Sequence, residues 1–333
     1  MCWPSADSPR PAIAALDPAT YQRHALHGEG RTWAETNCYT DLLIELAHGF
    51  GHEPLAMLPF TLAIDFEGDQ WTFFKPPHAE LDELYGMDVQ ELAIWRPLVD
   101  HVVEQVAAGH PVLVELDAWY LPDTAGTSYR TQHSKTTVGV NMIDVPGRRM
   151  GYFHNAGYYA LEGEDFEQAF LLGGIPHDRV LPPYVEFVKW RPGFRAPRGR
   201  ELVEASLPLL RRHLAHAPRE NPFPKFRARF AQDLAWLMQA DIGRFHAYSF
   251  ATLRQYGACF ELSETYLRWL GDHGVDGVAA PAAALKEISE TAKAFQFQLA
   301  RSMARKRPLD LAPIDAMGAA WSRAMDPLRD RFA

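Results

Sequence analysis

The sequence has few cysteines and lacks the short motifs that identify several common enzyme classes. Its 333 residues include only three cysteines, Cys2, Cys38 and Cys259. Three scattered thiols without a Cys-x-x-Cys pair argue against a disulfide framework and against a thiolate zinc site. Gly-x-Ser-x-Gly, Gly-x-Gly-x-x-Gly, Gly-x-x-x-x-Gly-Lys and His-Glu-x-x-His do not occur. Nothing therefore indicates serine-hydrolase, dinucleotide, P-loop or zincin chemistry.

Long apolar runs and an excess of positive charge are also missing. No run of about 18 apolar residues occurs, so we expect no membrane span. The first residues lack a basic region followed by an apolar one, so we expect no secretory signal and a cytoplasmic location. The formal net charge of −9 counts against general nucleic-acid binding.

The length and the hydrophobic patterns predict two domains. Residues 1–35 are rich in Pro, Ala and Asp and predict a loosely packed lead-in segment. Residues 36–195 predict an α+β domain, and Trp190 to Gly199 predicts a linker. Residues 200–333 predict an all-helical domain, because apolar side chains recur there every three or four residues, as in Leu285, Ile288, Ala292, Phe295, Leu299 and Met303.

Within the first domain the patterns predict helices followed by strands. Helices are expected over Asn37–Phe50, Leu92–Ala108 and Glu164–Leu171. Extended chain is expected over Pro59–Phe74 and Pro111–Tyr120. A hairpin is expected from Thr136–Asp144 and Met150–Asn155, with its turn at Pro146-Gly147.

Cys38 is the strongest candidate for a catalytic residue. It follows the polar run Trp33-Ala-Glu-Thr-Asn and precedes an amphipathic segment, which places the thiol on the first turn of a helix. Unpaired backbone N–H groups and the helix dipole favour a thiolate there. The alternative is an inert apolar cysteine in a helix.

Two histidines compete for the role of its base. His133 lies in a polar loop before a predicted strand, where catalytic groups often gather. His154 ends the second hairpin strand. Its neighbour Asn155 points to the opposite face of the sheet, so either His154 or Asn155 can face Cys38, but not both. We predict His133 as the base and Asn155 as the residue that orients it. The order Cys, His, Asn is that of a papain-like site.

A metal site and a docking surface are further candidates. Glu45, His48 and His52 share one helical face, and His101 and Glu104 share another, but such pairs also arise on solvated faces, so we predict no metal. Between Lys189 and Arg229 eleven Lys/Arg stand against three Glu, a balance of +8 that leaves −17 elsewhere. This basic band is either a solvated face or a dock for an acidic partner.

Several stretches resemble known proteins: Cys38-Tyr-Thr-Asp-Leu-Leu, Phe66-Glu-Gly-Asp-Gln-Trp-Thr-Phe-Phe-Lys, Leu116-Asp-Ala-Trp-Tyr-Leu-Pro and Gly151-Tyr-Phe-His-Asn-Ala-Gly-Tyr. The chain resembles a bacterial family often encoded near amino acid:carrier-protein ligases and small carrier proteins. Its first half is more distantly similar to the N-terminal domain of the butirosin biosynthesis protein H family, papain-like proteins that move an aminoacyl group from a carrier-protein thioester to an amine. That pattern has a His-x-x-His run, whereas this chain has His133-Ser-Lys-Thr136.

The resemblance implies a papain-like cysteine acyltransferase. Cys38 would attack an acyl or aminoacyl thioester on the phosphopantetheine arm of an acidic carrier protein, and an amine or thiol would accept the group. No bound cofactor is implied. Oxyanion or substrate contacts are expected from Asn37, Gln70, Asp117 and Tyr129. Carrier docking is expected from Arg211, Arg212 and Arg227. The alternatives are a cysteine peptidase or amidase of the same fold, and a non-catalytic partner of the carrier system.

Overall fold

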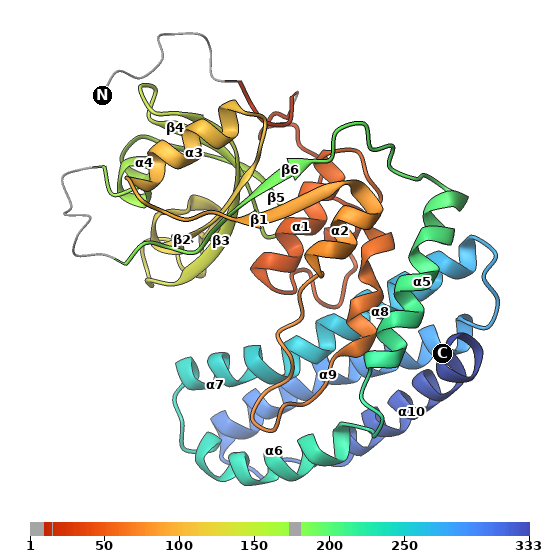
Figure 1. Cartoon of the computed structure of the whole chain (residues 1–333). Coiled ribbons are helices and arrows are strands. Elements are labelled where there is room, and N and C mark those ends of the chain that lie inside the picture. Colours follow the sequence, from red (N-terminus) through yellow and green to blue (C-terminus); the bar gives the residue numbers. More distant parts are fainter. Residues whose placement is uncertain (1–9, 15, 173–180) are drawn as a thin grey trace. The chain divides into compact units, whose positions relative to one another are not determined.

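The computed structural model describes residues 10–14, 16–172 and 181–333, and the chain forms two compact units (Figure 1). The first unit comprises Met1–Gly28, Asn37–Glu53 and Leu81–Ala196. The second comprises Glu29–Thr36, Pro54–Glu80 and Pro197–Ala333. The predicted α+β class is confirmed, with an antiparallel sheet in the N-terminal half and helices beyond residue 200.

The described part of the first unit contains a six-stranded antiparallel sheet in the order β1-β6-β2-β3-β4-β5. Its strands are β1 (Met87–Glu91), β2 (Val112–Asp117), β3 (Lys135–Asp144), β4 (Arg149–His154), β5 (Gly157–Glu162) and β6 (Val185–Trp190). The predicted hairpin is confirmed, since β3 and β4 pair up to Asp144 and Arg149. The backbone N–H of Gly147 donates to Asp144 Oδ1 at 2.9 Å and closes the turn.

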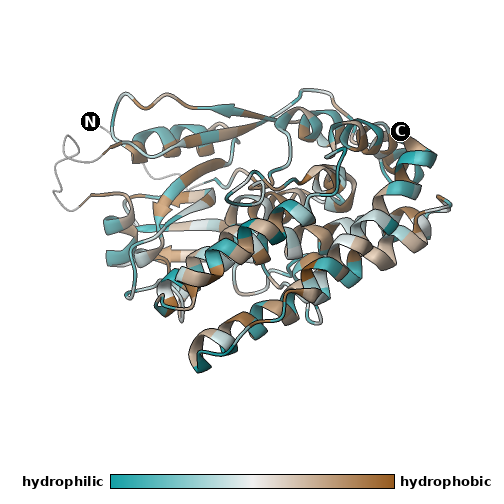
Figure 2. Cartoon of the chain, turned by 90° about the horizontal axis from the view of Figure 1, so that it is seen from below, coloured by the Kyte–Doolittle hydropathy of each residue, from teal (hydrophilic) through white to brown (hydrophobic). Residues whose placement is uncertain are grey.

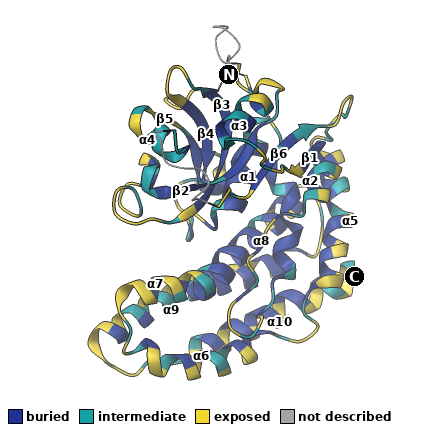
Figure 3. Cartoon of the chain, turned by 60° about the vertical axis from the view of Figure 1, so that its left-hand side comes forward, coloured by how far each residue is buried: buried dark blue, intermediate teal, exposed yellow. Residues whose placement is uncertain are grey.

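Helices cover both faces of this sheet. Alternate residues of the strands, such as Val114 and Val138, point to one face of the sheet. They join the hydrophobic core beneath α3 (Leu98–Ala107) and α4 (Gly163–Ala169). The opposite parity faces α1 (Cys38–Gly49), which packs on β3, β4 and β5. Figure 3 shows the strands buried and the loops at their ends exposed. Functional groups at the strand ends are therefore the accessible ones.

Helix α1 begins where the sequence predicts. The Asn37 side chain accepts a hydrogen bond from the backbone N–H of Thr40 at 2.9 Å, which satisfies one of the unpaired donors of the first turn. Gly51 follows the helix with a φ of 77°, a conformation that favours glycine. Leu42 packs against Gly139 of β3, where a Cβ atom would lie 2.8 Å from Leu42 Cδ1. The glycine therefore permits this close approach of helix and sheet.

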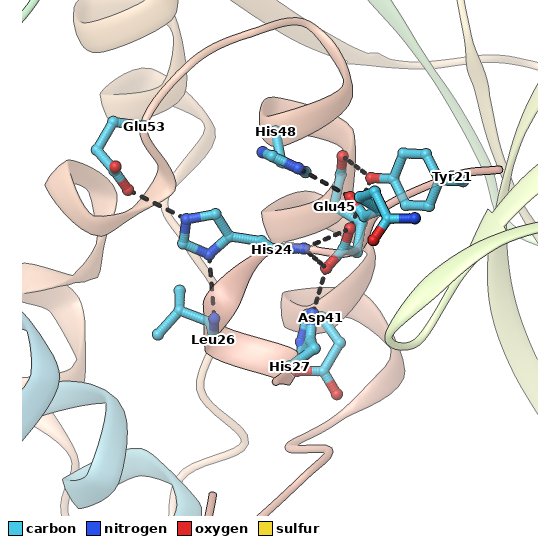
Figure 4. A network of polar contacts seen from close by, with 9 residues as sticks. Tyr21, His24, Leu26, His27, Asp41, Glu45, His48 and Glu53 are labelled. Carbon is cyan, nitrogen blue, oxygen red and sulfur yellow. Dashed lines mark hydrogen bonds and ion pairs between the residues drawn. The ribbon is translucent and has the colours of Figure 1, made fainter. Parts of the chain in front are cut away.

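The part of the lead-in segment from Tyr21 to His27 is firmly packed, where the composition predicts loose packing. A buried network fixes it to α1 (Figure 4). Glu45 accepts hydrogen bonds from Tyr21 Oη at 2.6 Å and from the His24 N–H at 3.0 Å, and its Oε1 lies 2.5 Å from His27 Nδ1. His27 Nε2 lies 3.2 Å from Asp41 Oδ1. Composition does not reveal this network, because the stabilising partners lie on α1.

Two further elements differ from the predictions. The first five residues of the segment expected to be extended belong to a 3₁₀ helix, η2 (Pro54–Ala63), and the rest is outside any regular strand. The residues of η2 are largely buried, so their alternation carries no information about a sheet face. The helix expected from Leu92 begins at Leu98, with Pro97 as its N-cap, because proline lacks the N–H group that an interior helical position needs and is best placed at a helix start. Residues 92–97 are thus free to line a cavity.

The second unit contains the predicted helices. They are α5 (Arg200–His216), α6 (Phe223–Leu237), α7 (Ile242–Ser249), the π-helical turn η6 (Phe250–Arg254), α8 (Gln255–Asp272), α9 (Ala279–Arg305) and α10 (Ala312–Phe332). Figure 2 shows hydrophobic and hydrophilic residues interspersed along the long helices. Trp71 lies among the rings of Phe223, Phe226 and Tyr256, at centroid distances of 5.1, 5.6 and 4.8 Å.

Four short helices complete the described chain: η1 (Ala25–His27), α2 (His78–Tyr85), η3 (Ala118–Tyr120) and η4 (Pro122–Thr124). Among the described helices, none is both long enough and apolar enough to cross a membrane.

Candidate functional site

A cavity of about 660 Å³ lies in the first unit, beside the end of β2. This volume falls in the range of small-molecule sites. Its wall is mostly apolar, and polar groups converge on it from β2 and from the segment before α3. The lining residues are Ile94, Trp95, Arg96, Pro97, Leu98, Glu115, Leu116, Asp117, Tyr120, Gln168, Ala169, Phe170, Leu171, Leu181, Pro182 and Pro183.

A second hollow of about 390 Å³ shares part of this wall. It is lined by His133, Ser134 and Lys135 together with Glu115, Leu116, Asp117 and Pro183, the last four of which also line the larger cavity. The two hollows therefore meet along the last residues of β2. A group bound in the larger one lies next to the residues of the smaller one.

Asp117 is fixed at this shared wall by three hydrogen bonds. Its Oδ1 accepts from the backbone N–H groups of Trp119 and Ser134, at 3.1 and 3.2 Å, and its Oδ2 lies 2.6 Å from His133 Nδ1. Burial by itself raises the pKa of this carboxyl group, but the hydrogen bonds outweigh it and hold the pKa below its ordinary value. Asp117 is therefore ionised at neutral pH.

His133 is held in one orientation although its side chain is 67% exposed. Asp117 binds Nδ1, and the ring stacks on the indole of Trp119 with a centroid distance of 4.5 Å and an interplanar angle of 9°. A carboxylate at Nδ1 favours the tautomer in which Nε2 accepts protons. Such an arrangement suits a general base, while an exposed ion pair stabilises the fold little.

The partner of His133 is thus Asp117, and not Asn155 as predicted. Asn155 lies in the turn between β4 and β5 with a φ of 43°. The physical reason is the strand register: Asp117 pairs with Lys135, the first residue of β3, so the two residues just before that strand, His133 and Ser134, meet Asp117. Sequence reasoning named Asp117 only as a substrate contact and missed Trp119. The run Asp117-Ala-Trp at a strand end was the available signal.

His154, the rival base, is enclosed on the α3 side of the sheet. Its Nδ1 lies 2.5 Å from Asp123 Oδ2, and its Nε2 lies 2.7 Å from Thr136 Oγ1. Tyr152 donates to the other oxygen of Asp123. Thr136 stands where the resembling pattern has its second histidine, and it contacts His154. By strand parity His154 faces away from α1, on which Cys38 lies.

Cys38 is the first residue of α1, as the sequence predicts, and its side chain is partly exposed. Helix α1 packs on β3 at the level of Gly139. Lys135 is four residues before Gly139, about 13 Å along the strand, and His133 comes two residues earlier. The contacts of His133 described above are with Asp117 and Trp119. The pairing of Cys38 with His133 therefore stays a prediction.

The two described cysteines are expected to differ strongly in reactivity. The Cys259 thiol is fully buried and lies 3.3 Å from the Thr61 carbonyl oxygen, and burial raises its pKa. Cys38 is partly exposed. In a Cys2→Ser background, limiting iodoacetamide should therefore label Cys38 at least about tenfold faster than Cys259. Peptide mapping measures both rates, and equal labelling of the native protein would contradict this expectation.

The other predicted contact residues come from three different segments of the chain. Asn37 caps α1. Tyr129 donates to Asp165 Oδ2 at 2.8 Å. Gln70 belongs to the second unit, in the turn that joins Phe66 to Trp71. None of their predicted roles at Cys38 is tested.

The residues of the alternative metal sites have other partners. Glu45 binds His27, His48 Nε2 lies 3.0 Å from the Gln22 carbonyl oxygen, and the ring of His52 stacks on Tyr85. Glu104 pairs with Arg96. Among the described residues no group of three or more His, Cys, Asp or Glu side chains is arranged to hold a metal ion.

Much of the basic band is paired with acidic side chains. Arg212 Nη1 lies 3.3 Å from Glu80, and Arg227 Nε lies 2.9 Å from Asp315 of α10. Lys189, Arg191, Arg200 and Arg229 also have acidic partners. Arg211 is exposed on α5. Acidic side chains from elsewhere in the chain therefore offset part of the +8 charge that this band carries along the sequence. Docking of a carrier protein there stays a prediction.

Comparison with protein families identifies the chain. The DUF1839 N-terminal domain matches residues 22–190, and the DUF1839 C-terminal domain matches residues 199–330. The chain therefore belongs to the DUF1839 family. No curated protein matches it. The resemblances to carrier-protein ligase neighbours and to butirosin biosynthesis protein H stay predictions.

Proposed function

We propose that the first unit is an acyl-transferring enzyme that binds an apolar acyl group in the larger cavity and uses His133 as its general base. The observation that carries the proposal is the Asp117–His133 pair at the wall shared by the two hollows. An oriented imidazole beside an apolar cavity is the arrangement expected for proton transfer to or from a bound substrate.

The chemistry follows from the contacts of His133. With Nδ1 held by Asp117, Nε2 takes a proton from the nucleophile, a water molecule or the amine or hydroxyl group of an acceptor. The nucleophile adds to the acyl carbon, and the bond to the leaving thiol or alcohol breaks. The imidazolium returns its proton to that leaving group. Asp117 stabilises the charged imidazolium without accepting the proton itself.

The cavity wall favours an apolar acyl group. Among the residues that line it, Leu116 and Phe170 are almost fully buried, whereas Trp95 is 77% exposed. The carboxylates of Glu115 and Asp117 lie on the side shared with His133. A group with an apolar tail and its reactive carbonyl near Asp117 fits this distribution.

A second candidate is the acyl-enzyme mechanism through Cys38, which the position of this thiol favours. A thiol on the first residue of a helix of twelve residues, after an asparagine cap, has the N-terminal environment that activates cysteine nucleophiles. A carrier-bound phosphopantetheine thioester and an amine or thiol acceptor belong to this candidate. A papain-like fold and a cysteine peptidase or amidase activity belong to it as well.

One set of variants distinguishes the two mechanisms. Turnover of acyl thioesters and 4-nitrophenyl esters of increasing chain length is compared in His133→Gln, Asp117→Asn and Cys38→Ser. General-base catalysis by His133 predicts a loss of about 10²–10⁴-fold in kcat for His133→Gln, a smaller loss for Asp117→Asn, and little change for Cys38→Ser. His216→Gln, an exposed histidine on α5, is the matched control.

The outcomes separate cleanly. Loss of turnover in Cys38→Ser, with an acyl adduct on wild-type Cys38 detected by intact mass, establishes the acyl-enzyme mechanism instead. If His133→Gln behaves as His216→Gln does, His133 is not the base. If neither substrate class is turned over and none of the corresponding fatty or N-acylated acids binds in calorimetry, the acyl-group proposal is wrong.

A further inference from the structure

Four exposed arginines on the second unit have no acidic partner. Arg301 and Arg305 are one turn apart on α9, Arg307 follows the end of that helix, and Arg244 lies on the first turn of α7. None of the four forms an ion pair with any described residue. Most other arginines described in this unit do form ion pairs with acidic side chains. The four therefore differ from the rest of the unit.

A lysine contact brings the end of α9 to the segment that carries Arg244. Lys306 is the C-cap of α9 and has a φ of 52°, a left-handed conformation that favours glycine. Its ammonium group donates a hydrogen bond to the carbonyl oxygen of Met238, the C-cap of α6. Asp241, three residues after Met238, is the N-cap of α7. The end of α9 therefore borders the turn between α6 and α7. Figure 3 shows this turn and α7 largely exposed.

The helix dipole does not account for these charges. Arg305 lies in the last turn of α9, where a cation is favourable, but Arg307 lies beyond the helix. Arg244 lies in the first turn of α7, where a cation is unfavourable. The acidic residues nearby in the sequence, Asp241 and Asp310, accept hydrogen bonds from backbone N–H groups at 2.8 and 3.0 Å. The guanidinium groups are therefore available to an external anion.

Two apolar side chains are exposed on the same surface. Ile242, the first residue of α7, is 67% exposed, and Trp236, near the end of α6, is 42% exposed. The Trp236 ring lies 5.7 Å from the ring of Tyr248, edge to face, which holds it beside α7. We call the six residues Trp236, Ile242, Arg244, Arg301, Arg305 and Arg307 the Ile242 surface.

We propose that the Ile242 surface binds the surface of a membrane that contains anionic phospholipids. Arginine binds phosphate groups through two parallel N–H groups, and the four guanidinium groups pair in this way with lipid phosphates. Ile242 and Trp236 enter the boundary between the headgroups and the acyl chains, where such side chains are favoured. Binding of this kind needs no membrane-spanning helix. The inference is independent of the acyl-transfer proposal.

The mixture of side chains favours a lipid surface over other anionic partners. A specific protein interface has an apolar core within roughly 800 Å² on each partner, whereas two apolar side chains stand here among four arginines. A nucleic acid offers phosphates but no apolar layer that accepts Ile242. An anionic bilayer offers both. The net charge of −9 does not prevent this contact, because charges beyond a Debye length of about 8 Å are largely screened.

The test measures binding of the full chain to vesicles of defined composition. Flotation compares vesicles made of equal parts of phosphatidylcholine and phosphatidylglycerol with vesicles of phosphatidylcholine alone. The anionic vesicles are expected to bind at least about tenfold more protein at low salt, and the difference should shrink as salt is raised. A fluorescent glutamate-rich peptide and a fluorescent oligothymidylate are titrated as probes of an acidic protein and of a nucleic acid.

Variants separate the ionic contact from the apolar contact. Arg301→Gln, Arg305→Gln and Arg307→Gln in one chain are expected to lower binding to anionic vesicles at least about tenfold and to remove most of its salt dependence. Ile242→Ser is expected to weaken binding at least about threefold and to leave the salt dependence, because it removes apolar contact alone. Ile242→Leu keeps an apolar side chain and should bind as wild type does.

A second triple variant controls for net charge. It combines Arg200→Gln, Arg268→Gln and Arg323→Gln, which change side chains that are 91, 66 and 53% exposed on the same unit but have acidic partners. Its net charge equals that of the first triple variant, and it should bind anionic vesicles as wild type does. Thermal unfolding of each variant checks that the fold is retained.

The inference is wrong if both kinds of vesicle bind equally, or if the two triple variants bind alike. Unchanged binding of Ile242→Ser also contradicts it, because no apolar contact with the bilayer is then made. Tighter binding of the peptide or of the oligothymidylate than of anionic vesicles, at matched concentrations of negative charge, overturns it as well. That result assigns the surface to an acidic protein or to a nucleic acid.

Discussion

Replacing Glu45 with alanine is expected to lower the free energy of unfolding by about 3–5 kcal/mol. Glu45 is fully buried and accepts hydrogen bonds from Tyr21 and His24, and it pairs with His27. Its removal leaves the imidazolium of His27 buried with Asp41 as the remaining carboxylate. Removing one partner of a buried ion pair destabilises the fold strongly, because the remaining charge is buried without solvent and without its partner.

Chemical denaturation followed by circular dichroism measures this effect. Glu104→Ala is the matched control. Glu104 lies on α3 of the same unit and also pairs with a cation, Arg96, but its side chain is 65% exposed. Its replacement should change the free energy of unfolding little, because solvent screens an exposed ion pair. A double-mutant cycle with His27→Ala should give a coupling energy of about 1–3 kcal/mol. Equal effects of Glu45→Ala and Glu104→Ala would show that the buried network does not hold the lead-in segment.

The stability of the protein is expected to fall by about 3 kcal/mol as pH rises from about 6.5 to 9. Burial by itself lowers the pKa of His27, but hydrogen bonds and charges of Asp41 and Glu45 raise it from 6.5 to about 9. A group whose pKa is higher in the folded state stabilises that state fully below its unfolded pKa. This stabilisation is lost as pH rises through the folded pKa.

At acidic pH the stability is expected to change with pH in the opposite direction. Burial raises the pKa of Glu45, but His27 and Tyr21 outweigh it and lower the pKa below 4.5, so its stabilisation is lost as pH falls through the folded pKa. Unfolding free energies measured across pH should therefore be greatest between about 5 and 6.5. His27→Gln should remove the alkaline decline, whereas His133→Gln should keep it. A wild-type profile that stays flat from 6.5 to 9 would contradict the raised pKa of His27.

Local sequence determined the elements whose signals lie within a few residues. Asn37 caps α1 by bonding Thr40 three residues later, and the apolar stripe from Leu285 to Met303 lies within α9. The β3–β4 hairpin follows from two β-rich stretches around a tight turn. Such features depend on propensity and periodicity, which a single sequence displays. The same reasoning placed Cys38 on the first turn of its helix.

Only the tertiary structure decided which residues meet. His133 and Asp117 are 16 residues apart and come together because β2 and β3 pair in one register. Arg227 meets Asp315, 88 residues away, which neutralises a cation that the sequence presents as part of a basic band. Glu45 reaches back to the lead-in segment, which composition alone describes as loose. Contacts of this kind depend on strand register and on the packing of distant segments, and local propensity carries no information about either.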